Sequence, residues 1–422
     1  MGALPMNSAD IRAEFRSSAN GPAVPRVSQG RSPGTPAPTR DHRIDLIRGL
    51  ALAMIFINHM PGNWLENWTS RNLGFSDAAE VFVLLAGYAA AFAFSPYLKA
   101  NDHRGAALKA ARRVGVLYAA HLATTLSAIA LFSSVMAAWG PSDTRDLIGI
   151  APILDDPVGH MIAILLGGFQ LSYFNILPMY VVLLALLPTM LWLAAKDLRL
   201  LAAASLATYL LTNMGGVMLP RSSNGDSWFF NPLAWQLVFV VGLVLGLRRS
   251  IGNQLVAYRW SCYLLAAGYL IFAAVWKLGQ FGGDLETAIL PAWMGSLQKS
   301  NLPLTRLFHV LALAYVVCHS PVWRWLSLLP KDFVLTQMGR HSLPVFMAGS
   351  LLSMAGWIVL KETQGGPVID ATVAAVGLLV MAALALWIEQ HARAPRLWPE
   401  GRSQTGLVHA GLVTISPAQQ AA

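Results

Sequence analysis

Charged side chains are scarce in this sequence: Asp, Glu, Lys and Arg together make up only 12% of its 422 residues. Soluble globular domains carry about 25% charged residues, because a hydrated surface needs them. Hydrophobic residues make up 55% of the chain. They gather in runs of about 18 to 22 residues, long enough to cross a hydrocarbon core of roughly 30 Å. The composition argues against a soluble enzyme and predicts an all-α, polytopic integral membrane protein.

Cysteine and several catalytic signatures are missing as well. The two cysteines, Cys262 and Cys318, lie inside apolar runs, and we interpret both as buried packing residues. No CxxC pair suggests a metal site or a disulfide framework, so we expect no metal. The chain also has no GxxxxGK(S/T) phosphate loop, HExxH helix or GxSxG elbow. ATP-driven pumping within this chain is therefore unsupported.

Acidic residues are outnumbered, since 30 Lys and Arg face 21 Asp and Glu and give a net charge of +9. In a soluble chain this excess would suggest a nucleic-acid partner. In a membrane protein it is explained by cytoplasmic loops, where Lys and Arg collect. We therefore expect the lipid bilayer, and no nucleic acid, as a partner.

Two tails without apolar runs flank the hydrophobic region. Residues 1–40 and 392–422 are rich in small and polar residues, and we expect both to be disordered cytoplasmic tails. The first tail lacks the apolar centre of a cleavable signal peptide. Residues 41–391 are predicted to form one transmembrane domain of about ten helices. The expected spans are 44–60, 76–97, 114–137, 174–194, 198–218, 230–247, 260–277, 305–322, 342–360 and 369–390.

One further apolar segment, residues 158–169, is too short to cross a membrane and contains two adjacent glycines. We predict that it is a re-entrant or interfacial segment. With ten spans and both termini in the cytoplasm, the inner side holds 23 Lys and Arg residues and the outer side seven. An eleventh span at 158–169 would move basic residues of the second half outside, so the charge distribution favours ten.

The first expected span carries ionisable residues, which are costly inside a membrane and need a reason. Arg48 lies roughly 60° and His59 about 40° from Asp45 around the helix, so all three share one face. His59 lies about 21 Å beyond Asp45 along the axis. An ion pair at the inner mouth and an imidazole near the outer end predict an aqueous path or site. We take His59 as a candidate catalytic residue and Asp45, Arg48 and Asn58 as candidates for substrate binding.

The second expected span opens with two carboxylates on the same outer side. Asp77 and Glu80 are three residues apart and share a helical face. Ser76 followed by acids is also typical of a helix start, where caps and the helix dipole favour oxygen atoms and negative charge. Capping explains one acid well, but Glu80 lies a full turn inside the span. We therefore treat both carboxylates as candidate catalytic residues beside His59.

Further polar residues lie at expected helix ends. On the cytoplasmic side arginines can bind phosphate, although for Arg112 and Arg113 a topology signal is the simpler explanation. Any single amide is more often a structural contact between helices, but four spans besides the first, counting the one that carries Asp77 and Glu80, deliver polar groups to one outer region. The remaining candidates for substrate binding are Asn175, Asn231, Arg306 and His309 on the outer side, and Arg340 and His341 on the cytoplasmic side.

These motifs resemble the OpgC family of bacterial membrane proteins, which is related to the acyltransferase 3 superfamily. The resemblance covers residues of about 40 to 395 and is most specific in the first two spans. Its strongest parts are RIDLIRGLA from Arg43, the pair Asn58-His59, and RNLGFSDAAEVFVLLAGY from Arg71. Shorter matches follow at Asn175–Tyr180, Phe230–Gln236, the pair Arg306 and His309, and Met338–Phe346.

The resemblance implies transfer of an acyl group, succinyl or acetyl, from a cytoplasmic acyl-CoA (succinyl-CoA or acetyl-CoA) to a periplasmic glucan or other glycan. It implies no permanently bound cofactor and a location in the bacterial inner membrane, where the distribution of Lys and Arg predicts that both termini are cytoplasmic. His59 would act as base or nucleophile, since imidazole does either near neutral pH. Asp77 or Glu80 would orient the imidazole or hold acceptor hydroxyls, and Arg48 would meet donor phosphates or the acyl carboxylate.

Other functions remain open on the residues themselves. A transporter or flippase for a small anionic or carbohydrate substrate also fits buried charges on one face. Transporters are often built from repeated halves, but RGLALAMIFINH has no partner in the second half. A scaffold for glycan assembly would leave the polar cluster without a chemical role. We favour the enzyme; the acyl group, the acceptor, the oligomeric state and an acyl-His intermediate stay open.

Overall fold

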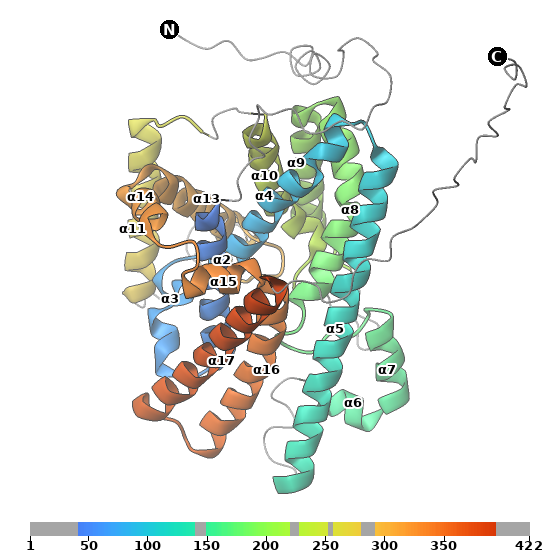
Figure 1. Cartoon of the computed structure of the whole chain (residues 1–422), viewed down its shortest axis with the longest axis vertical. Coiled ribbons are helices and arrows are strands. Elements are labelled where there is room, and N and C mark those ends of the chain that lie inside the picture. Colours follow the sequence, from blue (N-terminus) through green and yellow to red (C-terminus); the bar gives the residue numbers. More distant parts are fainter. Residues whose placement is uncertain (1–40, 140–148, 220–227, 252–255, 280–291, 394–422) are drawn as a thin grey trace, which may run out of the picture.

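The computed structural model of the protein describes residues 41–139, 149–219, 228–251, 256–279 and 292–393. Every regular element in these residues is a helix, which confirms the all-α class (Figure 1). The expected tail 1–40, and all but two residues of the expected tail 392–422, lie outside the described residues. The elements are α2 (His42–Asn58), η1 (Trp64–Trp68), α3 (Ser70–Leu73), α4 (Ala78–Lys99), α5 (His103–Trp139), α6 (Ala151–Asp155), α7 (Pro157–Leu165), α8 (Ile176–Lys196), α9 (Leu198–Gly215), α10 (Pro232–Ser250), α11 (Trp260–Leu278), α12 (Ala292–Gly295), α13 (Leu304–His319), α14 (Pro321–Leu328), α15 (Val334–Arg340), α16 (Ser342–Glu362) and α17 (Pro367–Arg393).

Each expected span coincides with a helix, but fewer than ten helices have the length and composition to cross a membrane. Among the described residues seven do: α4, α5, α8, α10, α11, α16 and α17. An eighth is added if α13 and α14, bent by 68° at a short break, count as one span. α2 is only 17 residues long and carries three charges, and α9 has Arg199 in its first turn and Thr212 and Asn213 near its end. The expected count of about ten spans is therefore not confirmed.

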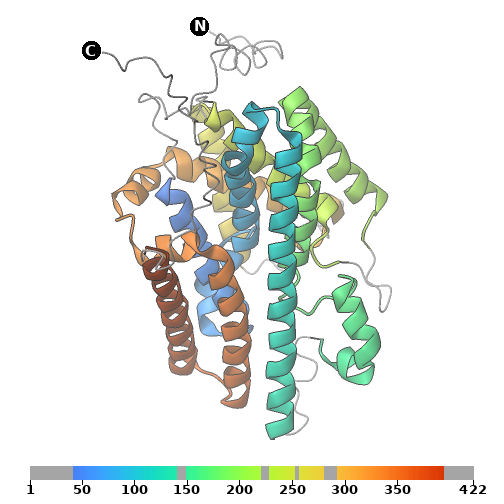
Figure 2. The same ribbon diagram turned by 45° about the vertical axis from the view of Figure 1, so that its right-hand side comes forward.

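The short segment between α5 and α8 is helical but too short to cross a membrane. α7 has nine residues, which corresponds to about 14 Å at 1.5 Å per residue. Figures 1 and 2 show α6 and α7 beside α5, apart from the rest of the bundle. The prediction that residues 158–169 form no full span agrees with this length.

α4 and α10 pack closely against each other, and glycine makes the close approach possible. A Cβ on Gly87 would overlap the carbonyl of Phe239, and a Cβ on Gly242 would overlap the carbonyl of Leu84. Small residues let membrane helices approach closely, where packing drives association. This pair holds together the helices that carry Asp77 and Glu80 on one side and Asn231 on the other.

α2 and α15 cross in the same manner. A Cβ on Gly49 would overlap the carbonyl of Leu335, and a Cβ on Gly339 would overlap the carbonyl of Asp45. The chain breaks at His341 immediately after this crossing and continues as α16. The break brings the first residues of α16 close to the middle of α2, which matters for the cavity described below.

The two cysteines are not packing residues of the interior. Cys262 and Cys318 both lie on the exposed surface of the bundle. The prediction that they are buried is wrong, because an apolar run in a membrane helix has a lipid-facing side as well as a protein-facing side.

A valine at Gly242 is expected to lower the melting temperature of the purified protein markedly. The added side chain would strike the Leu84 carbonyl, and overpacking of this kind typically costs about 1–3 kcal/mol or more. The matched control is Gly115→Ala on α5, where nothing lies within 4 Å of an added Cβ. Thermal unfolding in detergent measures both variants, and equal melting temperatures would contradict the close α4–α10 contact.

Candidate active site

α4 begins with a capping box that uses both predicted carboxylates. Asp77 Oδ1 accepts a hydrogen bond from the backbone N–H of Ala79 at 2.8 Å, and Glu80 Oε2 accepts one from the N–H of Asp77 at 3.0 Å. A capping box pairs the N–H groups that a helix start leaves free. Both acids are buried, Glu80 completely. The expectation that capping would not account for Glu80 is therefore wrong.

Two cations neutralise these carboxylates. Arg306 on α13 donates from Nε to Glu80 Oε1 at 2.6 Å, and its Nη2 lies 2.5 Å from the same oxygen and 3.5 Å from Asp77 Oδ2. Lys299 Nζ forms an ion pair with Asp77 Oδ2. Two negative and two positive charges thus balance, as a buried site requires. Arg306, which was predicted to bind substrate, instead forms ion pairs with the two predicted carboxylates.

His309 lies three residues after Arg306 on α13 and joins the same junction. Its Nδ1 accepts a hydrogen bond from the backbone N–H of Ser76 at 3.4 Å, and Ser76 Oγ lies 2.7 Å from the same nitrogen. The imidazole also packs so close to Gly74 that a Cβ there would overlap the ring. His309 therefore fixes the chain immediately before α4.

The segment that carries Lys299 is held by neighbouring helices. The backbone N–H of Asn231 donates to Ser300 O at 2.9 Å, and its amide Nδ2 donates to Asn301 Oδ1 at 3.0 Å. Trp235 Nε1 donates to the carbonyl of Lys299 at 2.9 Å. Asn231 Oδ1 also caps α10 by accepting from the N–H of Leu233. The predicted binding residue Asn231 thus serves to position Lys299.

His59 is the C-cap of α2. Its imidazole packs against Tyr173 with ring centroids 4.9 Å apart. Nδ1 is buried and has no hydrogen-bond partner among the described residues. The fields of Lys299, Asp77 and Arg71 act on the ring. The unbonded Nδ1 leaves the ring a free position for a proton or a substrate hydroxyl.

No hydrogen bond in the described part of the chain joins His59 to Asp77 or Glu80. The reason is that the carboxylate oxygens are already held by Arg306, Lys299 and the start of α4. No direct contact in the described residues therefore supports the hypothesis that Asp77 or Glu80 orients the imidazole of His59. Asp77 acts on His59 through its charge.

The other predicted amides lie nearby in different roles. Asn58 Oδ1 accepts a hydrogen bond from Thr69 Oγ1 at 2.7 Å, which braces the chain after α2. Asn175 is buried at the N-cap position of α8, but its side chain makes no capping bond. Of the three amides predicted to bind substrate, Asn58 and Asn231 therefore use their side chains to hold neighbouring backbone segments in place. The Asn175 side chain makes no capping bond.

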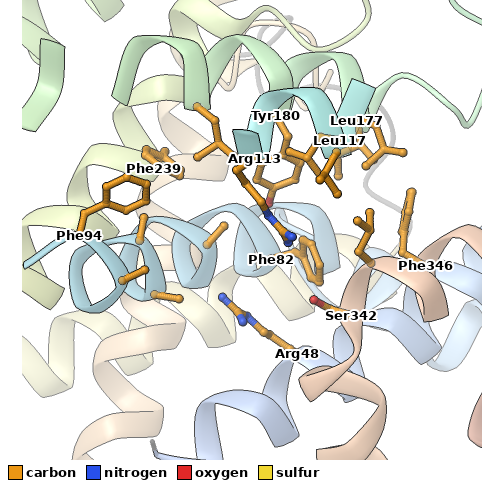
Figure 3. A pocket seen from close by; sticks show the side chains of 18 of the residues that line it. Arg48, Phe82, Phe94, Arg113, Leu117, Leu177, Tyr180, Phe239, Ser342 and Phe346 are labelled. Carbon is orange, nitrogen blue, oxygen red and sulfur yellow. The ribbon is translucent and has the colours of Figure 1, made fainter. Parts of the chain in front are cut away.

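A cavity of about 520 Å³ lies between α2, α4, α5, α8, α10 and α16 (Figure 3). On α4 its lining runs from Phe82 to Phe94, which corresponds to about 18 Å of helix at 1.5 Å per residue. Most of the wall is apolar, and Figure 3 shows Phe82, Phe239 and Phe346 around it. The cavity is therefore long and suited to a ligand with an uncharged extended part.

Four cations line this cavity, and no carboxylate is among its lining residues, all of which are described. Arg48 Nη2 donates to the carbonyl of Leu85 at 2.9 Å, which holds the guanidinium at the cavity wall. An arginine-rich site without acids favours an anion, because guanidinium groups pair well with carboxylate and phosphate. The cations are Arg48, Lys109, Arg112 and Arg113.

The predicted pair Arg340 and His341 lies outside this lining. Arg340 Nη1 lies 2.7 Å from one oxygen of Glu389 on α17, and His341 Nε2 lies 2.8 Å from the other. These contacts fasten the break between α15 and α16 to α17. Asp45 is buried close to the same break, where its carbonyl packs against Gly339.

The comparison with known families matches the region just described. A family model described as OpgC protein matches residues 40–393. The chain belongs to the OpgC family. The match includes the cavity, the His59 region and the paired charges of α4 and α13. No curated protein and no solved structure matches the chain.

Several residues of this OpgC-family site were not predicted. Lys299 lies in a short loop with no pattern to mark it, and Lys109 looks like an ordinary helix residue. Tyr180 and Ser342 lie inside the stretches Asn175–Tyr180 and Met338–Phe346 that resemble the family, but nothing in those stretches marks either residue as part of a cavity. Glu389 could have been found, because a carboxylate in an apolar run is costly and needs a partner. For the others only the packing of distant helices reveals the site.

Proposed function

We propose that this protein is a membrane O-acyltransferase. It moves an acyl group, succinyl or acetyl, from a cytoplasmic acyl-CoA to a hydroxyl of an extracytoplasmic glucan or other glycan. In this proposal the protein resides in a bacterial inner membrane with both termini cytoplasmic, and acyl-CoA is a co-substrate. The observation that carries it is the long cationic cavity in a member of the OpgC family.

The composition of the cavity wall supports an acyl-CoA donor. Coenzyme A thioesters join anionic phosphates to a long uncharged arm that ends in the thioester. Lys109 and Arg112 lie toward the Lys99–His103 turn, where phosphates would enter, and the wall continues as apolar and aromatic residues to Phe82 and Leu177. Phosphate is recognised by such cations, and the apolar stretch suits the arm.

His59 supplies the chemistry for transfer in this proposal. Its imidazole takes the proton of the acceptor hydroxyl, while the hydroxyl oxygen bonds to the thioester carbonyl carbon. The carbon–sulfur bond then breaks, and the thiolate leaves and recovers the proton, which yields an ester and free coenzyme A. The unbonded Nδ1 and the half-buried setting at the end of α2 support this role.

A transporter or flippase is the second candidate, because a cationic cavity within a helical bundle also fits an anion path. The test uses purified protein reconstituted in vesicles with acyl-labelled succinyl-CoA or acetyl-CoA on one side and candidate glucans on the other. Labelled ester on the glucan, identified by mass spectrometry, supports the transferase. Uptake of label without ester formation would replace it by the transporter.

Replacing Arg113 with alanine is expected to raise the KM for acyl-CoA about 10- to 100-fold with a smaller change in kcat. The reason is that a charge-assisted contact to the donor contributes roughly 1.5–3 kcal/mol to binding. Arg104→Ala is the matched control, because it removes the same charge from α5 outside the cavity. Initial rates at varied acyl-CoA concentration measure the KM of both variants. Equal KM values would contradict the proposal that the cavity binds the donor.

A further inference from the structure

Tyr180 is a buried tyrosine whose hydroxyl group is left without a hydrogen bond. The residue lies in the second turn of α8, is 7% exposed and lines the cavity. Its hydroxyl has no partner among the described residues. Buried polar groups are almost always paired, because an unpaired one is costly to keep. The empty hydrogen-bonding position points into a ligand cavity, which suggests that a ligand fills it.

Other polar groups face the same space. Figure 3 shows the guanidinium groups of Arg48 and Arg113 and the hydroxyl of Ser342 directed into the cavity with Tyr180. Arg48 and Tyr180 both line this one cavity. Ser342 is the first residue of α16, so the positive end of a 21-residue helix also faces the cavity there. Groups from four helices thus converge in an otherwise apolar space.

We propose that these groups form an oxyanion subsite in which the Tyr180 hydroxyl donates to a negatively charged oxygen of the donor. Every partner offered is a donor or positive: two guanidinium groups, two hydroxyls and a helix N-terminus, with no lining carboxylate. Such a set selects phosphate or carboxylate. The neutral phenol supplies a directed hydrogen bond that the arginines alone do not, which makes Tyr180 a specificity residue.

The proposal rests on acyl-CoA as the donor. Two parts of a succinyl-CoA donor carry a negatively charged oxygen that this subsite could bind. They are a phosphate of the nucleotide part and the distal carboxylate of the succinyl group. The test compares Tyr180→Phe with wild type on four thioesters: succinyl-CoA, acetyl-CoA, and the succinyl and acetyl esters of N-acetylcysteamine. The last two lack phosphates, and the acetyl pair lacks the carboxylate.

Tyr180→Phe is expected to lower kcat/KM about 10- to 100-fold for donors that carry the recognised oxyanion, and less than about twofold for the rest. A loss on both CoA donors alone identifies phosphate, and a loss on both succinyl donors alone identifies the carboxylate. An equal loss on all four donors, or no loss, would overturn the subsite.

Melting temperatures test whether the Tyr180 hydroxyl has a structural role. Because its hydroxyl is unpaired, Tyr180→Phe is expected to leave the melting temperature unchanged or raise it. Tyr209→Phe is the matched control, since the Tyr209 hydroxyl donates to Leu302 O at 2.8 Å in the interior, outside the cavity. That variant is expected to melt lower and to show no dependence on the donor.

Binding measurements separate this subsite from the proposed function. Calorimetric titration of wild type and Tyr180→Phe with CoA, pantetheine and succinate requires no transfer. If wild type transfers no acyl group yet binds CoA or succinate more tightly than Tyr180→Phe does, the transferase proposal fails and the subsite stands. Equal binding of every probe by the two proteins overturns the subsite, whatever the transfer assay shows.

Discussion

Alanine in place of His59 is expected to lower the rate of acyl transfer by about 10²- to 10⁴-fold, the usual contribution of a general base. The imidazole ends α2 and its Nδ1 has no partner among the described residues, so its removal breaks no hydrogen bond through that nitrogen. The protein is therefore expected to insert and melt as wild type does. Transfer to the glucan is measured at matched amounts of membrane protein.

His391→Ala is the control for this prediction. His391 lies near the end of α17, is exposed and contacts the carbonyl of Trp387 in its own helix. It is expected to keep full activity. Near wild-type transfer by His59→Ala would remove the imidazole from the mechanism, and an acyl group trapped on His59 would make it the nucleophile instead of the base.

Removal of the Arg306 side chain is expected to destabilise the protein by about 3–5 kcal/mol, the typical cost of leaving a buried charge without its partner. Glu80 is completely buried, and Arg306 is the cation that contacts it directly. Arg306→Ala would leave Lys299, which pairs with Asp77, to face two carboxylates. Melting temperature and monodispersity in detergent report the loss.

Two further variants make this second prediction decisive. Arg71→Ala breaks an exposed ion pair with Glu66, 3.7 Å apart, and is expected to cost less than about 1 kcal/mol. Adding Glu80→Gln to Arg306→Ala is expected to recover part of the lost stability, because glutamine keeps the capping bond and removes the uncompensated charge. If Arg306→Ala melts like Arg71→Ala, the buried charge network does not hold α4 to α13.

The balanced charges also revise the role of the two carboxylates. A catalytic acid needs free access to a proton or a substrate hydroxyl, whereas Glu80 is bonded to Arg306 and to the start of its own helix. Its geometry favours holding α4 and α13 together. His59 lies within the field of Asp77 and Lys299, so the network sets the electrostatic surroundings of the imidazole without touching it.

The helices themselves could be placed from the sequence, because span length and apolar composition are one-dimensional properties. The predicted spans 44–60 and 174–194 correspond to α2 at His42–Asn58 and α8 at Ile176–Lys196. The segment 158–169, predicted to be too short for a full span, contains the nine-residue helix α7. The family followed from motifs in the first two spans, and residues 40–393 match it.

The sequence by itself determined the class, the family and the polar residues worth attention; tertiary structure decided their partners. Glu80 and Arg306 are 226 residues apart, and Arg113 and Arg340 look alike as basic residues in predicted cytoplasmic segments. Yet Arg113 lines the cavity while Arg340 bonds Glu389. The physical reason is that the partner of a helical side chain depends on how its helix is rotated and on which helices pack against it. Glycine contacts between helices that are distant in the sequence determine both the rotation and the packing.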